Sequence, residues 1–289
     1  MLQESAVSAS VPIIRTLAEL QAQVAAWHAA GERVGLVPTM GALHAGHLSL
    51  AQASMARYAR TVATLFVNPK QFNDPADYEK YPRTEESDAV KLGSVGADLL
   101  YCPNPEEVYP HGFSTNISVG GVSAGLCGGS RPGHFDGVAT VCSKLFLQSR
   151  ADGAFFGEKD YQQLKVVQRV VADLNIPITI HPCETVRDAD GLALSSRNAH
   201  LAPGEREAAP ALYQALCDAG SAIARGANRI EALTRAADAV LAAGYDRIDY
   251  LEARREADLS PDFAAGEPAR VFGAAFLGQT RLIDNVRIG

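Results

Sequence analysis

Short apolar runs of β type alternate with longer stretches of helical periodicity through the first two thirds of the chain. The runs typical of buried strands cover residues 33–39, 61–68, 97–103, 151–157 and 177–182. Thr16 and Glu19 have capping-box spacing, which predicts a helix from residue 17 to a stop at Gly31. Further helical patterns lie at residues 47–59, 84–96, 137–148 and 161–175. This alternation predicts an α/β fold, a doubly wound, mainly parallel sheet with helices on both faces.

The last third of the chain has a different pattern. Alanine-rich helical stretches lie at residues 205–225 and 230–243, and strand patterns lie at residues 247–255 and 269–288. This order is typical of an α+β arrangement rather than of a continued parallel sheet. We therefore predict two domains, residues 1–184 and a smaller C-terminal α+β domain at residues 185–289.

Composition and charge narrow the class of protein. The chain has 289 residues and a net charge of −7, so it lacks the basic field that nucleic-acid binding requires. Its five cysteines are scattered and form no CxxC pair, which fits a reducing compartment rather than a disulfide framework. The N-terminus lacks the pattern of a signal peptide, and no run of 18 apolar residues predicts a membrane span. We expect a cytoplasmic protein that binds neither nucleic acid nor a membrane.

The stretch VPTMGALHAGHLSL, residues 37–50, lies where a predicted strand gives way to a helix. Gly41 lets the backbone pass close to a ligand, and a helix that begins near Ala45 would offer unpaired N–H groups to an anion. His44 and His47, three residues apart in the first turn, would face the same anion. Taken alone, the stretch favours one surface histidine and one core histidine over an anion site. A zinc pair is a third interpretation, although no third ligand is evident nearby.

Three other stretches place polar groups at the ends of predicted strands, where ligands of parallel sheets bind. FVNPKQF holds Asn68 and Gln71, FFGEKDYQQL holds Lys159, Asp160 and Gln163, and GLALSSRN holds two hydroxyls and a guanidinium. The last set can clamp a polyphosphate. Each stretch is a weak signal alone, but together they gather cations, hydroxyls and amides at one edge of a sheet.

Over nearly its whole length the chain resembles the pantoate–β-alanine ligase (pantothenate synthetase) family. The resemblance is carried by PTMGALHAGH, FVNPKQF, YPRT, RPGHFDGVATV, FGEKDYQQL, DGLALSSRN and TRLIDN. The first of these is similar to the HxGH signature of a wider nucleotidyltransferase superfamily, which includes class I aminoacyl-tRNA synthetases. The resemblance implies a Rossmann-like N-terminal domain that binds ATP and pantoate, a C-terminal lid domain, and a cytoplasmic homodimer.

The resemblance also implies the reaction. Pantoate and ATP form a pantoyl-adenylate with release of pyrophosphate, and β-alanine then displaces AMP to give pantothenate, a precursor of coenzyme A. Charge builds up around the α-phosphate, so positioning and electrostatic stabilisation are the main requirements. Mg²⁺ is expected on the ATP phosphates.

By resemblance, each role falls on residues that match the family's motifs. The expected catalytic residues are His44, His47, Lys159 and Arg197. ATP is expected to bind Met40, Gly41, Ala42, Leu43, His44, Ala45, Gly46, His47, Gly157, Glu158, Lys159, Asp160, Val186, Leu194, Ser195, Ser196 and Arg197. Pantoate is expected to bind Gln71, Gln163, Asn68 and Met40, and Asp88 is the expected magnesium ligand.

Two positions depart from the family's pattern. Asp136 stands where a basic residue is common, so a structural role for RPGHFDGV is at least as well supported as a phosphate-binding one. Leu194 replaces a methionine, a near-isosteric change of little consequence. An alternative function is an HxGH nucleotidyltransferase with a phosphorylated acceptor. It would need further basic residues, whereas Asn68, Gln71 and Gln163 are neutral. A non-catalytic nucleotide-binding module is a third hypothesis, which the GEKD and SSRN stretches disfavour.

Overall fold

The computed structural model describes residues 10–72 and 75–289. Chain contacts divide it into two compact units with interleaved segments. Unit 1 consists of the described residues up to Ser118, together with Gly133–Phe156 and Val167–Cys183, and unit 2 consists of Val119–Pro132, Gly157–Val166 and Glu184–Gly289. The expectation about a signal peptide falls mostly on residues 1–9, outside the described residues.

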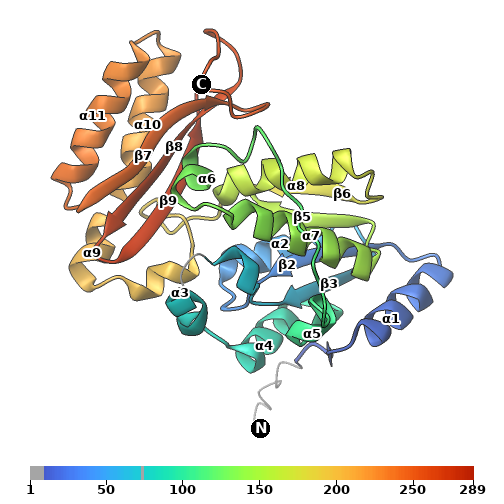
Figure 1. The fold of residues 1–289 in the computed structure, drawn as a ribbon. Helices are drawn as coiled ribbons and strands as arrows, with labels where there is room; N and C mark the ends of the chain where they lie inside the picture. Colours follow the sequence, from blue (N-terminus) through green and yellow to red (C-terminus); the bar gives the residue numbers. More distant parts are fainter. Residues whose placement is uncertain (1–9, 73–74) are drawn as a thin grey trace. The chain divides into compact units, whose positions relative to one another are not determined.

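Unit 1 is built around a six-stranded sheet with the order β1-β4-β3-β2-β5-β6 (Figure 1). Its strands are β1 (Ile13–Ile14), β2 (Val34–Thr39), β3 (Arg60–Leu65), β4 (Leu99–Tyr101), β5 (Gly153–Gly157) and β6 (Thr179–Cys183). The β1–β4, β4–β3, β3–β2 and β2–β5 pairs are all parallel. The predicted α/β fold with a Rossmann-like parallel sheet is confirmed.

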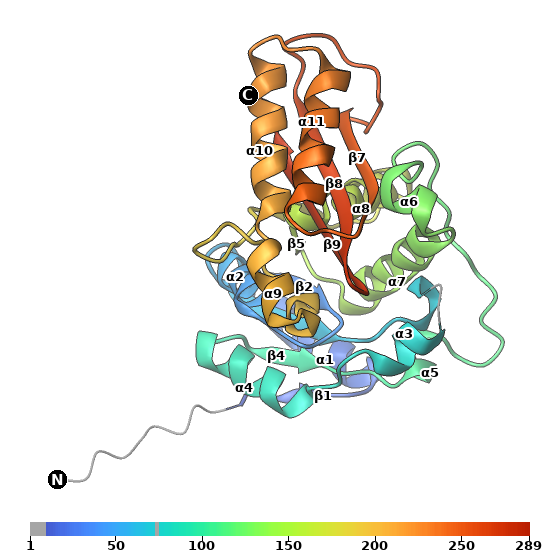
Figure 2. The same cartoon turned by 90° about the vertical axis from the view of Figure 1, so that its left-hand side faces the viewer.

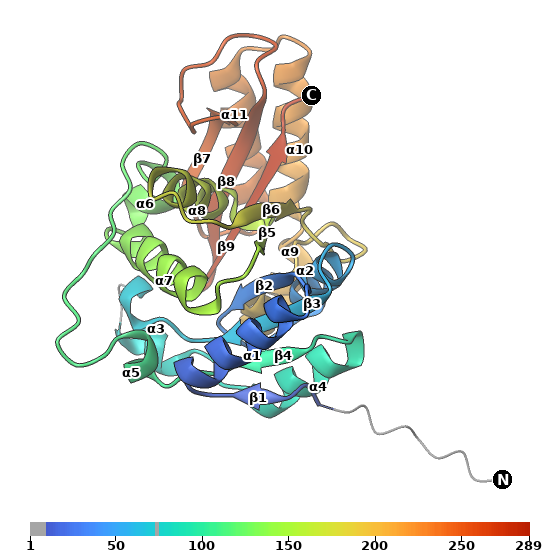
Figure 3. The ribbon, with the colours of Figure 1, turned by 90° about the vertical axis from the view of Figure 1, so that its right-hand side faces the viewer.

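Helices cover both faces of this sheet (Figures 2 and 3). The helices of unit 1 are α1 (Leu17–Ala29), α2 (Ala45–Met55), α3 (Pro75–Lys80), α4 (Glu85–Val95), α5 (Pro105–Val108) and α7 (His134–Ser149). Helix α8 (Tyr161–Asp173) begins in unit 2 and ends in unit 1. The capping box of α1 is present: Glu19 N donates to Thr16 Oγ1, and Thr16 N donates to the Glu19 carboxylate.

Helix α2 lies very close to β2, and glycine makes this approach possible. A Cβ on Gly35 would fall 2.1 Å from Ser54 Oγ, so no larger residue fits there without a shift. Ser54 is fully buried on α2 and its hydroxyl lies 2.7 Å from Thr61 Oγ1 on β3. These contacts hold the C-terminal end of α2 against β2 and β3.

Unit 2 contains a three-stranded antiparallel sheet formed by β7 (Arg247–Arg255), β8 (Ala269–Leu277) and β9 (Thr280–Arg287). Helices α10 (Ala211–Ala224) and α11 (Arg229–Ala242) pack on one face of it (Figure 1). Leu212, Leu216 and Val240 are among the helix residues that form this core with Val271 and Ala275 of the sheet.

The helical stretch predicted at residues 205–225 is two helices. Helix α9 (Pro203–Ala208) ends before Pro210, and α10 begins directly after it. Proline has no N–H to continue the helical hydrogen bonds and its ring clashes with the preceding turn. Unit 2 also contains α6 (Leu126–Ser130), which the hydrophobic pattern did not predict. Within residues 10–72 and 75–289, no helix is long and apolar enough to cross a bilayer.

Candidate active site

The strand-to-helix turn after β2 carries both predicted histidines. Helix α2 begins at Ala45, as predicted, and His44 is its N-cap residue. Gly46 N donates to His44 Nδ1 at 3.1 Å, and His44 N donates to His47 Nδ1 at 3.3 Å. The two ring centroids are 4.1 Å apart. The imidazoles therefore form a reciprocal capping box, the arrangement usually made by a hydroxyl and a carboxylate.

This cap corrects the expectation that the first N–H groups of α2 are open to an anion. Gly46 N is bonded to the His44 ring, and His47 N donates to His44 O at 2.8 Å. Because Nδ1 of each ring accepts a hydrogen bond, a neutral imidazole here carries its proton on Nε2. In the neutral form each imidazole is therefore a donor through Nε2, while most backbone donors of the turn are already bonded.

Asp88 lies against this turn but does not fit the expected role of magnesium ligand. The side chain is fully buried and its carboxylate accepts hydrogen bonds from Ala42 N, Leu43 N and Thr84 Oγ1. A Mg²⁺ ion keeps several waters in octahedral geometry, which this enclosed carboxylate cannot accommodate. In the described part of the chain, no group of three or more His, Cys, Asp or Glu side chains is arranged to hold a metal ion.

Three of the four predicted pantoate residues lie together beside the same turn. Gln71 Nε2 donates to Met40 Sδ at 3.0 Å, and Asn68 Nδ2 donates to Gln71 Oε1 at 3.0 Å. Asn68 is 1 % exposed, and its Oδ1 accepts from the Tyr109 hydroxyl at 2.8 Å. This network fixes the amide of Asn68, so that Gln71 and Met40 line a small neutral surface suited to a hydroxy acid.

The RPGHFDGV stretch holds this amide network in place. Gly137 lies so close to the 69–71 turn that a Cβ would fall 2.3 Å from Lys70 O. Its carbonyl accepts from Asn68 Nδ2 at 3.0 Å. Asp136 accepts hydrogen bonds from Asn116 Nδ2 and Ser118 Oγ, at 3.3 and 2.9 Å. The carboxylate that departs from the family's pattern thus ties a loop to the first turn of α7.

In unit 2, the GEKD segment is held by residues that follow it by more than a hundred positions. Asn285 Nδ2 donates to the carbonyls of Glu158 and Lys159, at 2.8 and 3.1 Å. Arg270, which is 4 % exposed, donates to the Glu158 carboxylate at 2.7 Å and to Asn285 Oδ1 at 2.7 Å. These bonds fix the backbone that carries Lys159, whose ammonium lies 3.8 Å from Asp160 Oδ2.

The segment from Val186 to Asn198 is anchored by a buried ion pair. Arg187 donates to both carboxylate oxygens of Asp284, at 2.5 and 2.9 Å, and stacks on the Tyr213 ring at 3.7 Å. Leu194 N donates to Val186 O, which closes the two arms of the loop. Ser195 Oγ then accepts from Arg197 N at 3.3 Å and caps the short helix Ser196–His200.

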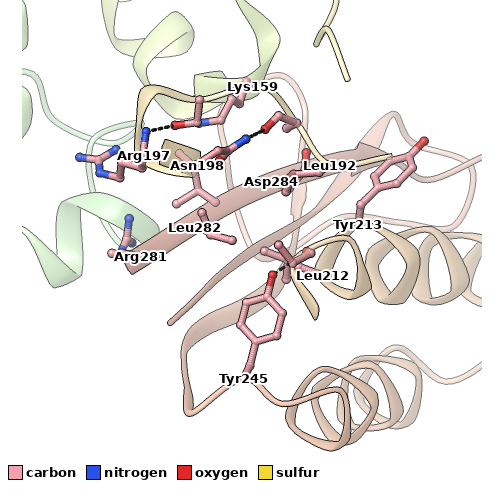
Figure 4. Close-up of a pocket in the computed structure, with 14 residues that line it drawn as sticks. Lys159, Leu192, Arg197, Asn198, Leu212, Tyr213, Tyr245, Arg281, Leu282 and Asp284 are labelled. Carbon is pink, nitrogen blue, oxygen red and sulfur yellow. Dashed lines mark hydrogen bonds between the residues drawn. The ribbon is translucent and has the colours of Figure 1, made fainter. Parts of the chain in front are cut away.

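A pocket within unit 2 brings the predicted phosphate-binding residues together (Figure 4). Lys159, Ser195 and Arg197 line it, and so do Asn198 and Arg281, which stand in the quoted GLALSSRN and TRLIDN stretches without an assigned role. Asn198 Nδ2 donates to Ala193 O, while its buried Oδ1 has no hydrogen-bond partner among the described residues. Cationic and amide groups from three segments therefore meet at one cavity.

The cationic character of this region extends beyond the predicted residues. The Arg131 guanidinium is buried near Arg197 and Arg281, and burial together with these like charges lowers its pKa. Arg281 is oriented by Asp249, which accepts from its Nε and Nη2 atoms at 2.9 and 2.7 Å. The carboxylate of Asp249 thus balances part of the positive charge in this region. Arg131 and Arg281 stand in the RPGHFDGVATV and TRLIDN stretches that carry the family resemblance, but the sequence assigned no role to either arginine.

Gln163 is the predicted pantoate residue that lies in unit 2. It is half-buried on α8, next to Gln162, which is 5 % exposed. Gln162 Nε2 donates to the carbonyls of Val122, Ala124 and Gly125, so it shapes the loop before α6. Of two adjacent glutamines, one therefore holds the fold and the other leaves its amide for another role.

Comparison with known proteins decides the family. The sequence model of the pantoate-β-alanine ligase family matches residues 12–287. The chain belongs to this family. It is 58 % identical over 279 residues to the pantothenate synthetase of Chelativorans sp. (strain BNC1), with 96 % of this chain and 98 % of the relative covered.

Solved structures of family members are similar over the same length. The crystal structure of pantothenate synthetase from Thermus thermophilus has a TM-score of 0.89 and 44 % identity, and covers 96 % of this chain and 99 % of that one. The pantoate-β-alanine ligase from Francisella tularensis, solved as a complex with β-γ ATP and β-alanine, has a TM-score of 0.80 and 31 % identity. It covers 96 % of this chain and 97 % of that one.

Proposed function

We propose that this protein condenses pantoate with β-alanine in an ATP-dependent reaction that proceeds through a pantoyl-adenylate. The observation that carries the proposal is membership of the pantoate-β-alanine ligase family across residues 12–287. A pantoate carboxylate oxygen attacks the α-phosphorus of ATP, and pyrophosphate leaves with the electrons of the broken P–O bond. The neutral amine of β-alanine then attacks the acyl carbon, and AMP leaves.

In this proposal ATP binds the residues that match the family's nucleotide motifs. Residues 1–184 form the domain that binds ATP and pantoate, and residues 185–289 form a smaller lid domain. The Nε2–H groups of His44 and His47 donate hydrogen bonds to phosphate oxygens, and Lys159 neutralises the charge that accumulates as the α-phosphate is attacked. No net proton transfer from His47 is needed in the first step.

The pocket of unit 2 supports a role for Ser195 and Arg197 in holding the departing pyrophosphate, and we add Arg281 to this set. Ser196 is included because it stands between them in the SSRN motif. Gly157, Glu158, Asp160, Val186 and Leu194 complete the proposed nucleotide contacts. Anionic phosphate groups match the cationic side chains of Lys159 and Arg197 that line this pocket, and Arg281 is a further donor oriented by Asp249.

The buried amide network of unit 1 supports pantoate binding. Gln71 presents an amide next to the Met40 thioether, and we propose that Gln163 provides the second amide. Neutral amides discriminate in favour of a hydroxyl and a carboxylate over a phosphorylated acceptor, which would require more cations. Mg²⁺ is included as the partner of the ATP phosphates, where it would neutralise charge, and no side chain of this protein is assigned to it.

The test is to withhold β-alanine. With ATP, Mg²⁺ and pantoate alone, the protein should release about one equivalent of pyrophosphate per site and retain a pantoyl-adenylate. Addition of β-alanine should then release AMP and pantothenate in equal amounts. Continuous pyrophosphate release without any pantothenate would instead favour nucleotidyl transfer to another acceptor. Light scattering tests the further proposal that the protein is a homodimer, and a tagged copy in cells tests the proposed cytoplasmic location.

A further inference from the structure

The turn between β2 and α2 has a backbone conformation that needs external support. Gly41 and Ala42 both have positive φ angles, +89° and +52°. A positive φ is strained for alanine, and such strain persists only where surrounding contacts hold the backbone. This turn leads directly into His44, so any change in its shape moves the cap of α2.

The Asp88 carboxylate provides that support. Oδ2 accepts from Ala42 N at 2.9 Å and from Thr84 Oγ1 at 2.8 Å, and Oδ1 accepts from Leu43 N at 2.9 Å. Ala42 N also lies 3.1 Å from Thr84 Oγ1. Two successive peptide N–H groups of the strained turn therefore bond to one rigidly held carboxylate.

Lys91 adds a positive charge beside the Asp88 carboxylate and a hydrogen bond to the same turn. Its ammonium lies 3.6 Å from Asp88 Oδ1 and donates to Leu43 O at 2.8 Å. Asp88 also stands in the first turn of α4, where the helix dipole favours a negative charge. The carboxylate is thus bonded by protein groups instead of solvent, and side chains of α4 bind both the N–H and the C=O of Leu43.

We propose that Asp88 is a positioning residue for His44 and His47, with Lys91 and Thr84 as its supports. The carboxylate fixes the turn from Gly41 to Leu43, and this sets where α2 begins and where the Nε2 edges of both imidazoles lie. The inference rests on the proposed function, because it assigns a task to a site whose chemistry is the adenylation of pantoate. It replaces the role of magnesium ligand for this residue.

The decisive variant is Asp88→Asn, which keeps the shape of the side chain but replaces one acceptor by an NH₂ group. That group must face either Ala42 N or Leu43 N, so one bond to the turn is lost. Misplacement of catalytic groups by about 1 Å costs about 100-fold in rate, so we expect ATP–pyrophosphate exchange in the presence of pantoate to fall about 10- to 100-fold. The attack of β-alanine on preformed pantoyl-adenylate should change much less.

A second measurement reports on the histidines without turnover. In ¹⁵N NMR spectra of histidine-labelled protein, His44 and His47 should have their neutral proton on Nε2 in the wild type. In Asp88→Asn the two rings should show mixed tautomers, because the turn no longer holds their Nδ1 atoms against backbone N–H groups. Unchanged tautomers would overturn the proposal even where activity is lost.

The matched control is Asp152→Asn. Asp152 accepts from Val34 N at 2.7 Å, so this is the same substitution at a carboxylate bonded to the opposite end of β2. It should leave exchange within about twofold of wild type and leave both tautomers unchanged. If Asp88→Asn does not fold, Thr84→Val removes one support of the carboxylate and should produce the same effects on a smaller scale; their absence would overturn the proposal.

A titration with Mg²⁺ separates positioning from metal binding. Excess Mg²⁺ should not restore exchange in Asp88→Asn, and the midpoint of activation by Mg²⁺ should match the wild type. Full rescue by Mg²⁺ would overturn the proposal in favour of a metal ligand. Failure of the proposed function is a distinct outcome, because the wild-type protein itself would then form no pantothenate, whereas the NMR tautomers still test the positioning role.

Discussion

The turn that carries His44 and His47 and the segment that carries Lys159 acquire their shapes in different ways. The histidine turn is held by its own imidazole cap and by Asp88. The lysine segment is held by Asn285, which bonds its carbonyls from a strand more than a hundred residues away. The first depends on a buried carboxylate beside it, and the second exists only after the antiparallel sheet of unit 2 has formed.

The largest expected effects come from removing the cation or the donor itself. His47→Gln and Lys159→Met should each lower ATP–pyrophosphate exchange about 100- to 1,000-fold, the usual cost of losing a group that stabilises transition-state charge. The exposed residues His111 and Lys80 offer matched controls, His111→Gln and Lys80→Met, which should exchange at the wild-type rate. A loss below about fivefold in either site variant would mean that the corresponding segment does not serve the α-phosphate.

The next effect tests the long-range support of Lys159. Asn285→Ala removes both hydrogen bonds to the GEKD backbone and the Arg270 bond to Asn285 Oδ1. We expect exchange to fall about 10- to 100-fold through misplacement of Lys159. Asn228→Ala is the control, because it removes only the cap of α11; it should cost about 1 kcal/mol of stability with unchanged exchange. Equal kinetics in both variants would contradict the supporting role.

A smaller effect is expected from Arg281, which the pocket adds to the proposed phosphate site. Arg281→Gln removes one charge-assisted donor and should weaken inhibition by pyrophosphate about tenfold. The control is Arg247→Gln, which changes an exposed arginine stacked on Phe276 at the edge of the same sheet. If both variants bind pyrophosphate as the wild type does, Arg281 is only a structural partner of Asp249.

The smallest expected effect is a pH dependence of the stability of unit 1, which contains His181. Burial and the nearby Arg57 and Arg33 lower the pKa of His181 from its ordinary value of 6.5. The folded state therefore binds a proton at His181 less readily than the unfolded state does. The contribution of neutral His181 to the free energy of unfolding is present above pH 6.5 and is lost as the pH falls. Thermal unfolding of unit 1 should therefore shift to lower temperature as the pH falls from 6.5 by about one unit, and His181→Gln should reduce the shift. If His181→Gln shows the same pH-dependent shift as the wild type, other titratable groups cause the shift.

Local patterns predicted the elements that carry the site. The alternation of strands and helices indicated the parallel sheet, and the spacing of Thr16 and Glu19 indicated the cap of α1. The helical pattern at residues 47–59 indicated α2, which begins two residues earlier at Ala45. These features depend on residues close together in the sequence, so their physical causes are visible in the sequence.

Features set by distant contacts were not predictable in the same way. The first N–H groups of α2 were expected to be open, but imidazole rings accept hydrogen bonds from the backbone there. This cap depends on the orientation of the two rings. Asp88 was expected to be the magnesium ligand among the roles that the family resemblance implied. Only the burial of this carboxylate and its backbone hydrogen-bond donors indicate that it supports the turn from Gly41 to Leu43. The break at Pro210 was available from the sequence, since proline interrupts a helix, but the alanine-rich pattern on both sides obscured it.

The register of strand β9 against β8 decides whether two segments of unit 2 are held in place. Its neighbouring residues Asp284 and Asn285 pair with Gly273 and Phe272 of β8, across a two-residue turn that begins at Gly278. Asp284 holds the loop that carries Arg197, and Asn285 holds the backbone of Lys159. A slip of one residue in this hairpin would turn every side chain of β9 to the other face and separate both segments from their anchors at once. The correct register of this hairpin is therefore required for the pocket lined by Lys159 and Arg197. A misregistered protein would keep its helices but would not form this pocket.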